Sequence, residues 1–117
     1  MQKQVEEFHR AMGLTVGGSV ALRNAEMRAE LIREEAQETV EAIEQGDLAA
    51  AVDGLCDLIY VALGAAVTWG IDLEPVFNEV HRANMAKLGG PVRADGKQLK
   101  PDGWQPPRIA EMIDPKS

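Results

Sequence analysis

The sequence lacks the features that stabilise or target a secreted protein. Its single cysteine, Cys56, excludes a disulfide framework and indicates a reducing compartment. The first ten residues, MQKQVEEFHR, have no apolar stretch of the kind that a signal peptide contains. No internal repeat and no low-complexity tract divides the 117 residues. We therefore expect one cytoplasmic domain that spans residues 1–117.

Positive charge is scarce as well. The chain has 12 lysines and arginines against 19 aspartates and glutamates, and this net charge of −7 argues against a nucleic-acid-binding surface. The deficit lies in residues 1–88, which carry 15 acidic and 7 basic residues, whereas residues 89–117 carry 4 and 5. The apolar run at residues 55–67 is too short for a membrane span and contains Asp57. We expect neither a nucleic acid nor a membrane as a partner.

Glycines and capping residues divide the rest of the sequence into helical segments. The predicted helices span residues 2–12, about 20–45, 48–69 and about 73–88. Ser19 is the expected N-cap of the second helix, and Gly46 and Asp47 form a tight turn into the third. Because short links make consecutive helices antiparallel neighbours, we predict an all-α fold.

The predicted architecture is an antiparallel helical bundle of four main helices, with a helical core at about residues 2–88 and an irregular tail at 89–117. Asp95 and Gly96 indicate a small hairpin within this tail, at residues 92–100. The second helix has a main apolar stripe that we expect to face the core, made of Ala25, Ala29, Ile32, Ala36, Val40 and Ile43.

Two aspartates interrupt the most apolar stretch of the chain. Asp53 and Asp57 lie one helical turn apart in residues 48–69, where Cys56 and Tyr60 are the only other ionisable side chains. A helix that is apolar nearly all round is a buried helix, so we expect Cys56 to be a small core residue. An ionised carboxylate buried without a partner costs several kcal/mol. A cation must therefore meet the two aspartates.

Arginines are too few to supply that cation. Residues 26–57 contain ten acidic residues and two basic ones, Arg28 and Arg33. In a hairpin that turns at Gly46, residues 35–38 stand opposite residues 54–57, which brings together Glu35, Glu38, Asp53 and Asp57. Four carboxylates cannot all stay ionised at one level without compensation. Oxygen ligands alone indicate a hard divalent ion, Mg²⁺, with Mn²⁺ as a substitute.

The order of these motifs resembles a known group of enzymes. Glu34, Glu35 and Glu38 form an EExxE motif, an acidic pair ending in Asp57-Leu-Ile-Tyr60 follows, and Asn84-Met-Ala-Lys87 comes near the end of the fourth helix. Over about residues 20–90 the chain resembles the all-α nucleoside triphosphate pyrophosphohydrolases, which include MazG-like, phosphoribosyl-ATP pyrophosphohydrolase-like and dimeric dUTPase-like proteins. One position departs from their pattern, because Gly54 stands where the family usually has a carboxylate.

The resemblance implies a hydrolase that converts a nucleoside triphosphate to the monophosphate and pyrophosphate, a nucleotide pyrophosphatase of nucleotide-pool housecleaning. It implies Mg²⁺ held by the four carboxylates named above, with Glu34 or one of the ligands taking the proton of the attacking water. Asn84 and Lys87 would face the substrate, and Lys87, with Arg82, would stabilise charge on the departing pyrophosphate. Tyr60 lies on the aspartate strip and could bind a ligand or the substrate.

Other interpretations stay open at this point. A di-iron carboxylate bundle needs Glu-x-x-His pairs, which neither His9 nor His81 supplies. A non-catalytic acidic helical oligomer with a structural cation or a basic protein partner remains an alternative. The base is not determined: dUTP, dCTP and noncanonical triphosphates all fit. The apolar surface at residues 55–67 exceeds what its neighbours can cover, so we expect a homodimer, and the resemblance adds a homotetramer.

Overall fold

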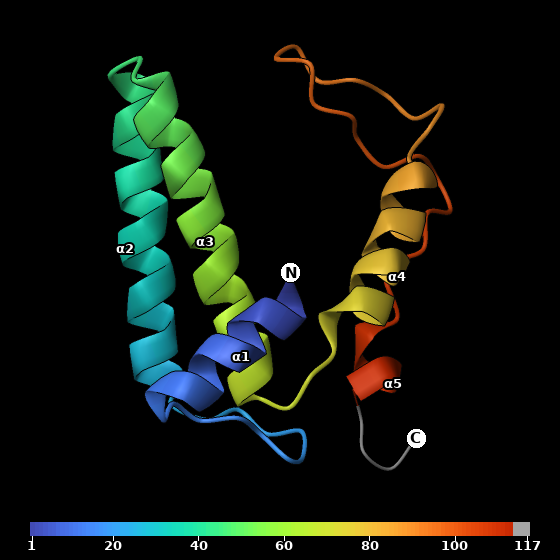
Figure 1. Cartoon of the computed structure of the whole chain (residues 1–117). Coiled ribbons are helices and arrows are strands. Elements are labelled where there is room, and N and C mark those ends of the chain that lie inside the picture. The colour runs from blue at the N-terminus through green and yellow to red at the C-terminus, as the bar shows by residue number, and fades with distance from the viewer. Residues whose placement is uncertain (114–117) are drawn as a thin grey trace. The chain divides into compact units, whose positions relative to one another are not determined.

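A computed structural model describes residues 1–113 of the chain. The all-α prediction is confirmed over this part, which forms five helices (Figure 1): α1 Gln2–Met12, α2 Ala25–Glu44, α3 Leu48–Thr68, α4 Leu73–Met85 and α5 Ile109–Ile113. The chain divides into two compact units, one at residues 1–72 and one that begins at residue 73. Each unit is described by itself.

In the first unit, α2 and α3 form the predicted antiparallel hairpin and lie side by side (Figure 1). Gly46 takes a left-handed conformation with φ of 71°, which favours glycine at the end of a helix. The side chain of Asp47 then accepts a hydrogen bond from the backbone N–H of Ala50 (3.1 Å) and caps α3. Local capping chemistry thus fixes the turn, and α1 packs against α3.

The register of the hairpin is set by the close approach of Gly54 to Thr39. A Cβ atom added at Gly54 would lie 2.5 Å from Thr39 Oγ1 and 3.1 Å from Thr39 Cα. Thr39 in turn donates a hydrogen bond to the carbonyl of Glu35 (2.6 Å), so its side chain is folded onto α2. Residue 39 stands opposite residue 54, which confirms the predicted register to within one residue.

The start of α2 differs from the prediction. The helix begins at Ala25 rather than just after Ser19, and Asn24, with φ of 52°, precedes it. The segment before it is extended because its polar groups bind the C-terminal end of α3. Gly17 N–H donates to the carbonyl of Val67 (2.9 Å), and Arg23 donates to that of Thr68 (3.0 Å). These contacts satisfy carbonyls at the end of α3 and compete with helix formation.

The packing face of α2 was also predicted wrongly. The buried residues are Arg28, Thr39 and Ala42, whereas Val40 and Ile43 of the expected stripe are 51% and 59% exposed. The face that carries Arg28, Thr39 and Ala42 is the one that packs in the single chain. The expected stripe is half-buried at Ile32 and Ala36 and exposed at its other four positions.

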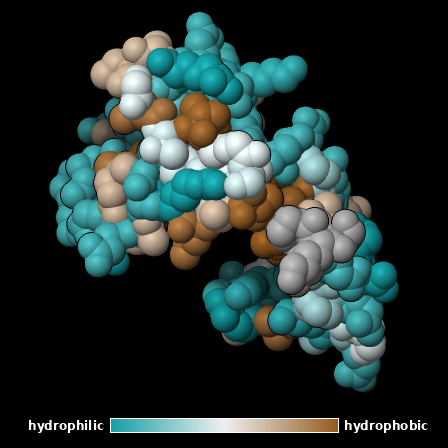
Figure 2. All heavy atoms as spheres, turned by 90° about the horizontal axis from the view of Figure 1, so that it is seen from below, coloured by the Kyte–Doolittle hydropathy of each residue, from teal (hydrophilic) through white to brown (hydrophobic). Residues whose placement is uncertain are grey.

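The prediction that α3 is buried all round is wrong for the single chain. Its buried residues are Ala51, Gly54 and the run Gly64–Thr68, while Cys56, Asp53 and Asp57 are exposed and Leu55 is 49% exposed. Two neighbours, α1 and α2, leave much of the helix uncovered. On the face seen in Figure 2, apolar side chains, in brown, lie open among hydrophilic ones.

By length and composition alone, α3 could cross a membrane: it has 21 residues and a mean hydropathy of 1.7 in its most apolar window. It is longer than the apolar run considered in the sequence. The core helix of a soluble protein meets the same criteria, and Asp53 and Asp57 would be costly in a bilayer.

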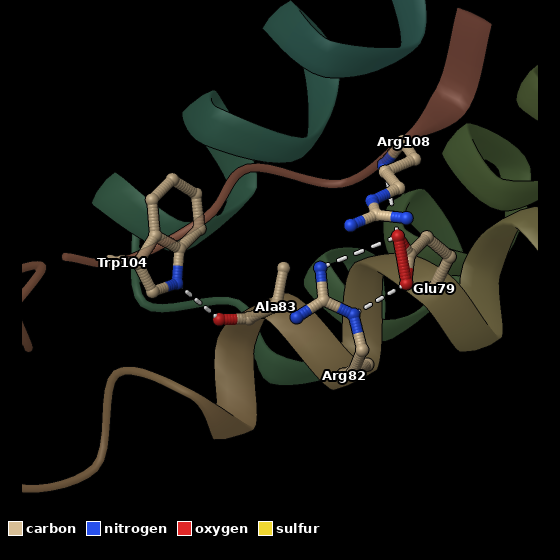
Figure 3. A network of polar contacts seen from close by, with 5 residues as sticks. All are labelled: Glu79, Arg82, Ala83, Trp104 and Arg108. Carbon is tan, nitrogen blue, oxygen red and sulfur yellow. Dashed lines mark hydrogen bonds and ion pairs between the residues drawn. The ribbon is translucent and has the colours of Figure 1, made fainter. Parts of the chain in front are cut away.

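In the second unit, the chain after α4 folds back on that helix. Val92 and Gln98 form an antiparallel bridge, which confirms the predicted hairpin. The α4 helix ends at Met85, three residues before the predicted end, and the chain continues in hydrogen-bonded turns to Gly90. The indole N–H of Trp104 donates to the carbonyl of Ala83 (2.6 Å) and fixes the tail to α4 (Figure 3). The sequence did not predict α5.

Candidate functional site

The predicted acidic residues come from facing turns of α2 and α3. Of the five carboxylates, Glu34, Glu38, Asp53 and Asp57 are exposed and Glu35 is partly buried. The hairpin register puts the α2 glutamates beside the α3 turn that carries Asp57. The structure thus assembles the predicted set from two helices, although its members lie at the surface of the single chain rather than in a buried seam.

Glu35 is the central member of this acidic cluster. Its Oε2 atom is shielded from solvent and has no hydrogen-bond partner in the protein. Burial raises the pKa of Glu35, and the neighbouring negative charges raise it further, in the order Glu38, Asp57, Glu34 and Asp53. The other four acids thus all act electrostatically on Glu35, as the register predicted.

No basic side chain of residues 1–113 neutralises the cluster. Arg33 pairs with Glu30, which lies outside the cluster, and Arg28 forms no ion pair with any described acid. An isolated oxygen among uncompensated carboxylates fits a hard divalent cation in donor type and charge. As they stand, no three metal-ligating side chains of the described residues converge on one point. Rotation of exposed side chains toward Glu35 would have to complete a metal site.

The structure explains why residue 54 carries no carboxylate. A side chain at this position would meet the backbone of α2 at Thr39, so only glycine allows the observed approach of the two helices. Asp53, one residue earlier, lies at the exposed side of the same turn. The departure from the family pattern is therefore a consequence of the packing between α2 and α3.

A second polar cluster lies where α1, α2 and α3 meet, and the sequence did not identify it. His9 is 2% exposed and Arg28 is 4% exposed. His9 Nδ1 contacts the carbonyl of Thr15 (2.9 Å), and a Cβ atom at Gly64 would lie 2.7 Å from Arg28 Nη1 and 3.1 Å from His9 Nε2. Burial lowers the pKa of Arg28. Gly64 makes room for both side chains, because any larger residue would meet them.

Tyr60 lies between the two clusters on α3. Its ring packs edge to face on that of Phe8 in α1, with centroids 5.6 Å apart and an interplanar angle of 77°. Tyr60 is 40% exposed, so it is accessible to a ligand. Its predicted role in substrate binding stays a prediction.

The remaining predicted site residues, Arg82, Asn84 and Lys87, belong to the second unit. Arg82 donates two hydrogen bonds to Glu79 (2.5 and 3.3 Å), and Glu79 also accepts one from the backbone N–H of Arg108 (2.9 Å), as Figure 3 shows. These bonds lower the pKa of Glu79, with that from Arg82 having the largest effect. Arg82 is thus already paired, whereas Asn84 is exposed.

Lys87 takes part in a contact that the sequence did not reveal. Its Nζ lies 5.6 Å from the centroid of the Trp104 ring, and Nζ of Lys100 lies 4.7 Å from the same centroid. The two lysines are 13 positions apart and come together because the tail folds back on α4. No local pattern in the sequence could have paired them.

The chain matches the profile of one protein family, described as phosphoribosyl-ATP pyrophosphohydrolase, over residues 5–84. The match includes the whole acidic cluster and stops before the hairpin, Lys100 and Trp104. A search of curated proteins gives no match.

Proposed function

Because the chain belongs to the phosphoribosyl-ATP pyrophosphohydrolase family, within the all-α MazG-like superfamily, we propose that it hydrolyses a nucleoside triphosphate to the monophosphate and pyrophosphate with the help of Mg²⁺. The family makes the chain a pyrophosphohydrolase for a nucleotide-like substrate. In the proposed reaction, water attacks the α-phosphorus, and the bond from the α-phosphorus to the bridging oxygen breaks. Pyrophosphate leaves with that oxygen.

The observation that supports this proposal is the uncompensated acidic cluster around Glu35. A protein gains nothing in stability from five neighbouring carboxylates without a cation, since like charges repel. Such a group is explained by a role that needs the charges. We propose Glu35, Glu38, Asp57 and Asp53 as the residues that would hold Mg²⁺, which would supply positive charge for the phosphate oxygens.

The chain's own residues have separate roles in this proposal. Glu34, exposed beside the metal-binding set, accepts the proton of the attacking water. Tyr60 contacts the bound nucleotide from the next turn of α3. Asn84, Lys87 and Arg82 on α4 bind the substrate, as the resemblance of their motif implies. For Arg82, substrate binding has to compete with Glu79.

A substrate panel tests the proposal directly. Purified protein with Mg²⁺ is incubated with dUTP, dCTP, the common nucleoside triphosphates, noncanonical triphosphates and phosphoribosyl-ATP, the compound in the family's name, and released pyrophosphate is measured. We expect release from at least one triphosphate and none in excess EDTA. Release from phosphoribosyl-ATP alone would make that compound the substrate. No release from any of them would favour a non-catalytic acidic oligomer.

We further propose that two copies of the chain pair through their open apolar surfaces. Val40, Ile43, Leu55 and Ile59 are each 45% exposed or more. Large apolar side chains on two adjacent helices are a surface that association would bury. Sedimentation at micromolar concentration should give a dimer or a tetramer, and Ile59→Glu should shift it toward the monomer. A wild-type monomer under these conditions would contradict the proposal.

A further inference from the structure

We propose that Lys87, Lys100 and Trp104 form a binding site for the phosphate chain of a nucleotide or for free pyrophosphate. The site lies wholly within the second unit, and all three residues fall outside the part of the chain that matches the family. The identity of the ligand rests on the proposed function, because pyrophosphate is a product of that reaction. The geometry of the site is independent of the proposed function.

The two ammonium groups are close enough to bind one anion together. Each lies about 5 Å from the centroid of the Trp104 ring. Their Nζ atoms are therefore at most about 10 Å apart, and an anion with more than one phosphate is long enough to contact both. A cation over an aromatic face is stabilised by that face, so Trp104 holds both lysines without neutralising them.

The protein fixes the Trp104 ring and the backbone that carries the two lysines. Trp104 is fixed by its hydrogen bond to the carbonyl of Ala83. The amide of Gln98 donates to the carbonyls of Lys87 (3.1 Å) and Gly90 (2.7 Å), which ties the hairpin to the end of α4. A Cβ atom at Gly90 would lie 2.6 Å from the carbonyl oxygen of Leu99, so the backbone next to Lys100 is packed tightly. The backbone and the indole ring therefore lose little further conformational entropy on binding.

Lys87 and Lys100 differ from Arg82 and Arg93 in having no acidic partner. Among the described residues of the second unit, Arg82 pairs with Glu79 and Arg93 with Asp95, whereas neither Lys87 nor Lys100 forms an ion pair. Asp102 lies two residues from Lys100 in the sequence and is exposed, yet it pairs with neither lysine. Two cations held at one ring repel each other, and an anion that binds both offsets that repulsion.

The test measures binding of sodium pyrophosphate by titration calorimetry, without divalent cations and with EDTA present. Under these conditions the acidic cluster of the first unit repels the probe. We expect Lys100→Ala to weaken binding about tenfold or more, as for the loss of a hydrogen bond to a charged group. Lys100→Arg should retain binding, because it keeps both the charge and the contact with Trp104.

Two variants of the same loop serve as matched controls. Lys97→Ala removes an equal charge from the hairpin, away from the ring, and should change the affinity less than twofold. Asp102→Asn removes a nearby negative charge and should strengthen binding. Circular dichroism and melting curves of each variant establish that the fold is retained. Equal losses in Lys97→Ala and Lys100→Ala would overturn the site, since they would show a general effect of charge.

Further arms of the experiment separate the sources of the phosphate chain. Nucleoside triphosphate and pyrophosphate should bind with similar affinity, and the nucleoside alone should not bind. Binding of the triphosphate but not of pyrophosphate, or no binding of pyrophosphate at millimolar concentration, would overturn the inference. Hydrolysis is assayed separately with Mg²⁺. If hydrolysis fails while Lys100→Ala still weakens pyrophosphate binding, the proposed function falls and the binding site stands.

Discussion

Residues 1–72 contain 13 acidic and 5 basic residues, and five of the acids gather on two adjacent helix turns with no cation between them. Residues 73–117 contain 6 acidic and 7 basic residues, and in their described part Arg82 and Arg93 pair with acids while Lys87 and Lys100, at the Trp104 ring, form no ion pair. The first region collects negative charge that repels itself. The described part of the second contains two ion pairs and holds Lys87 and Lys100 at one ring without an acidic partner.

This difference shows two ways of holding charged groups in place. The acids of the first region are positioned by packing: Gly54 on Thr39 and the capped turn at Asp47 set the register, and no ion pair contributes. In the second region polar contacts do the positioning, such as the bonds to Glu79 and that of Trp104 to Ala83. Repelling charges can be held together only if packing supplies the stability, which is why the acidic cluster sits on the helix hairpin.

The largest expected effect is on catalysis by the acidic cluster. Glu38→Gln or Asp57→Asn removes a proposed ligand without changing the size of the side chain. We expect hydrolysis to fall roughly 100-fold or more, because the loss of charge stabilisation at a reacting phosphate costs at least that much. The measurement is the rate of pyrophosphate release with saturating Mg²⁺.

The matched control in the second region is Glu79→Gln, which removes the charge of an acid that pairs with Arg82 on α4. It should leave more than a third of the wild-type rate, because Glu79 serves to hold Arg82 and the tail. Full activity in both Glu38→Gln and Asp57→Asn would remove the metal-site hypothesis, and with it the contrast between the regions.

The next effect concerns the packing that brings the acids together. Gly54→Ala puts a Cβ atom against the backbone of α2 and should destabilise the protein by about 1–2 kcal/mol, even after the better helix propensity of alanine is counted. Gly64→Ala meets only the ends of the Arg28 and His9 side chains, which can move, so its cost should be smaller. Urea unfolding measures both. Greater stability in Gly54→Ala would show that the helices are not in close contact there.

The free energy of unfolding should depend on pH with opposite signs through Glu35 in the first region and Glu79 in the second. The pKa of Glu35 is raised from its ordinary 4.5, so the folded state binds this proton more tightly than the unfolded state. The free energy of unfolding of metal-free protein should therefore fall as the pH rises from 4.5 through the raised pKa. Melting temperatures in EDTA across this range should show the fall in wild type and a smaller one in Glu35→Gln.

For Glu79 the sign reverses. Its pKa is lowered from 4.5, so its contribution to stability is complete above 4.5 and is lost as the pH falls through the lowered value. Glu79→Gln should remove this loss of stability at low pH, and it should leave unchanged the fall in stability above pH 4.5 that Glu35 causes. The same slope in Glu35→Gln and in wild type above pH 4.5 would contradict the assignment for Glu35.

The smallest expected effect concerns Asp53. In metal-free protein Asp53→Asn should melt slightly higher than wild type, because one repelling charge near Glu35 is gone. Excess Mg²⁺ should narrow or reverse this difference if Asp53 is a ligand, since the variant would then bind the ion less tightly. Melting curves with and without Mg²⁺ test this. Identical Mg²⁺-induced shifts in the two proteins would show that Asp53 is not a ligand.

The sequence by itself determined the elements that depend on near neighbours. The conformational preferences of single residues and hydrogen bonds over a few positions determine these elements. They are the helix ends at Gly13, Gly46 and Trp69, the cap at Asp47 and the hairpin at residues 92–98. The sequence also determined which turn of α2 lies beside Asp57, because a tight turn allows an antiparallel helix hairpin only one register.

Tertiary structure alone decided which surfaces meet. Periodicity alone does not say which face of α2 packs on α3. The fit of Thr39 against Gly54 selects the face that carries Thr39 and Ala42. The late start of α2, the burial of Arg28 and the approach of Lys87 to Trp104 likewise depend on residues far apart in the chain. Their stability comes from contacts that exist only once the chain has folded, so no local pattern in the sequence records them.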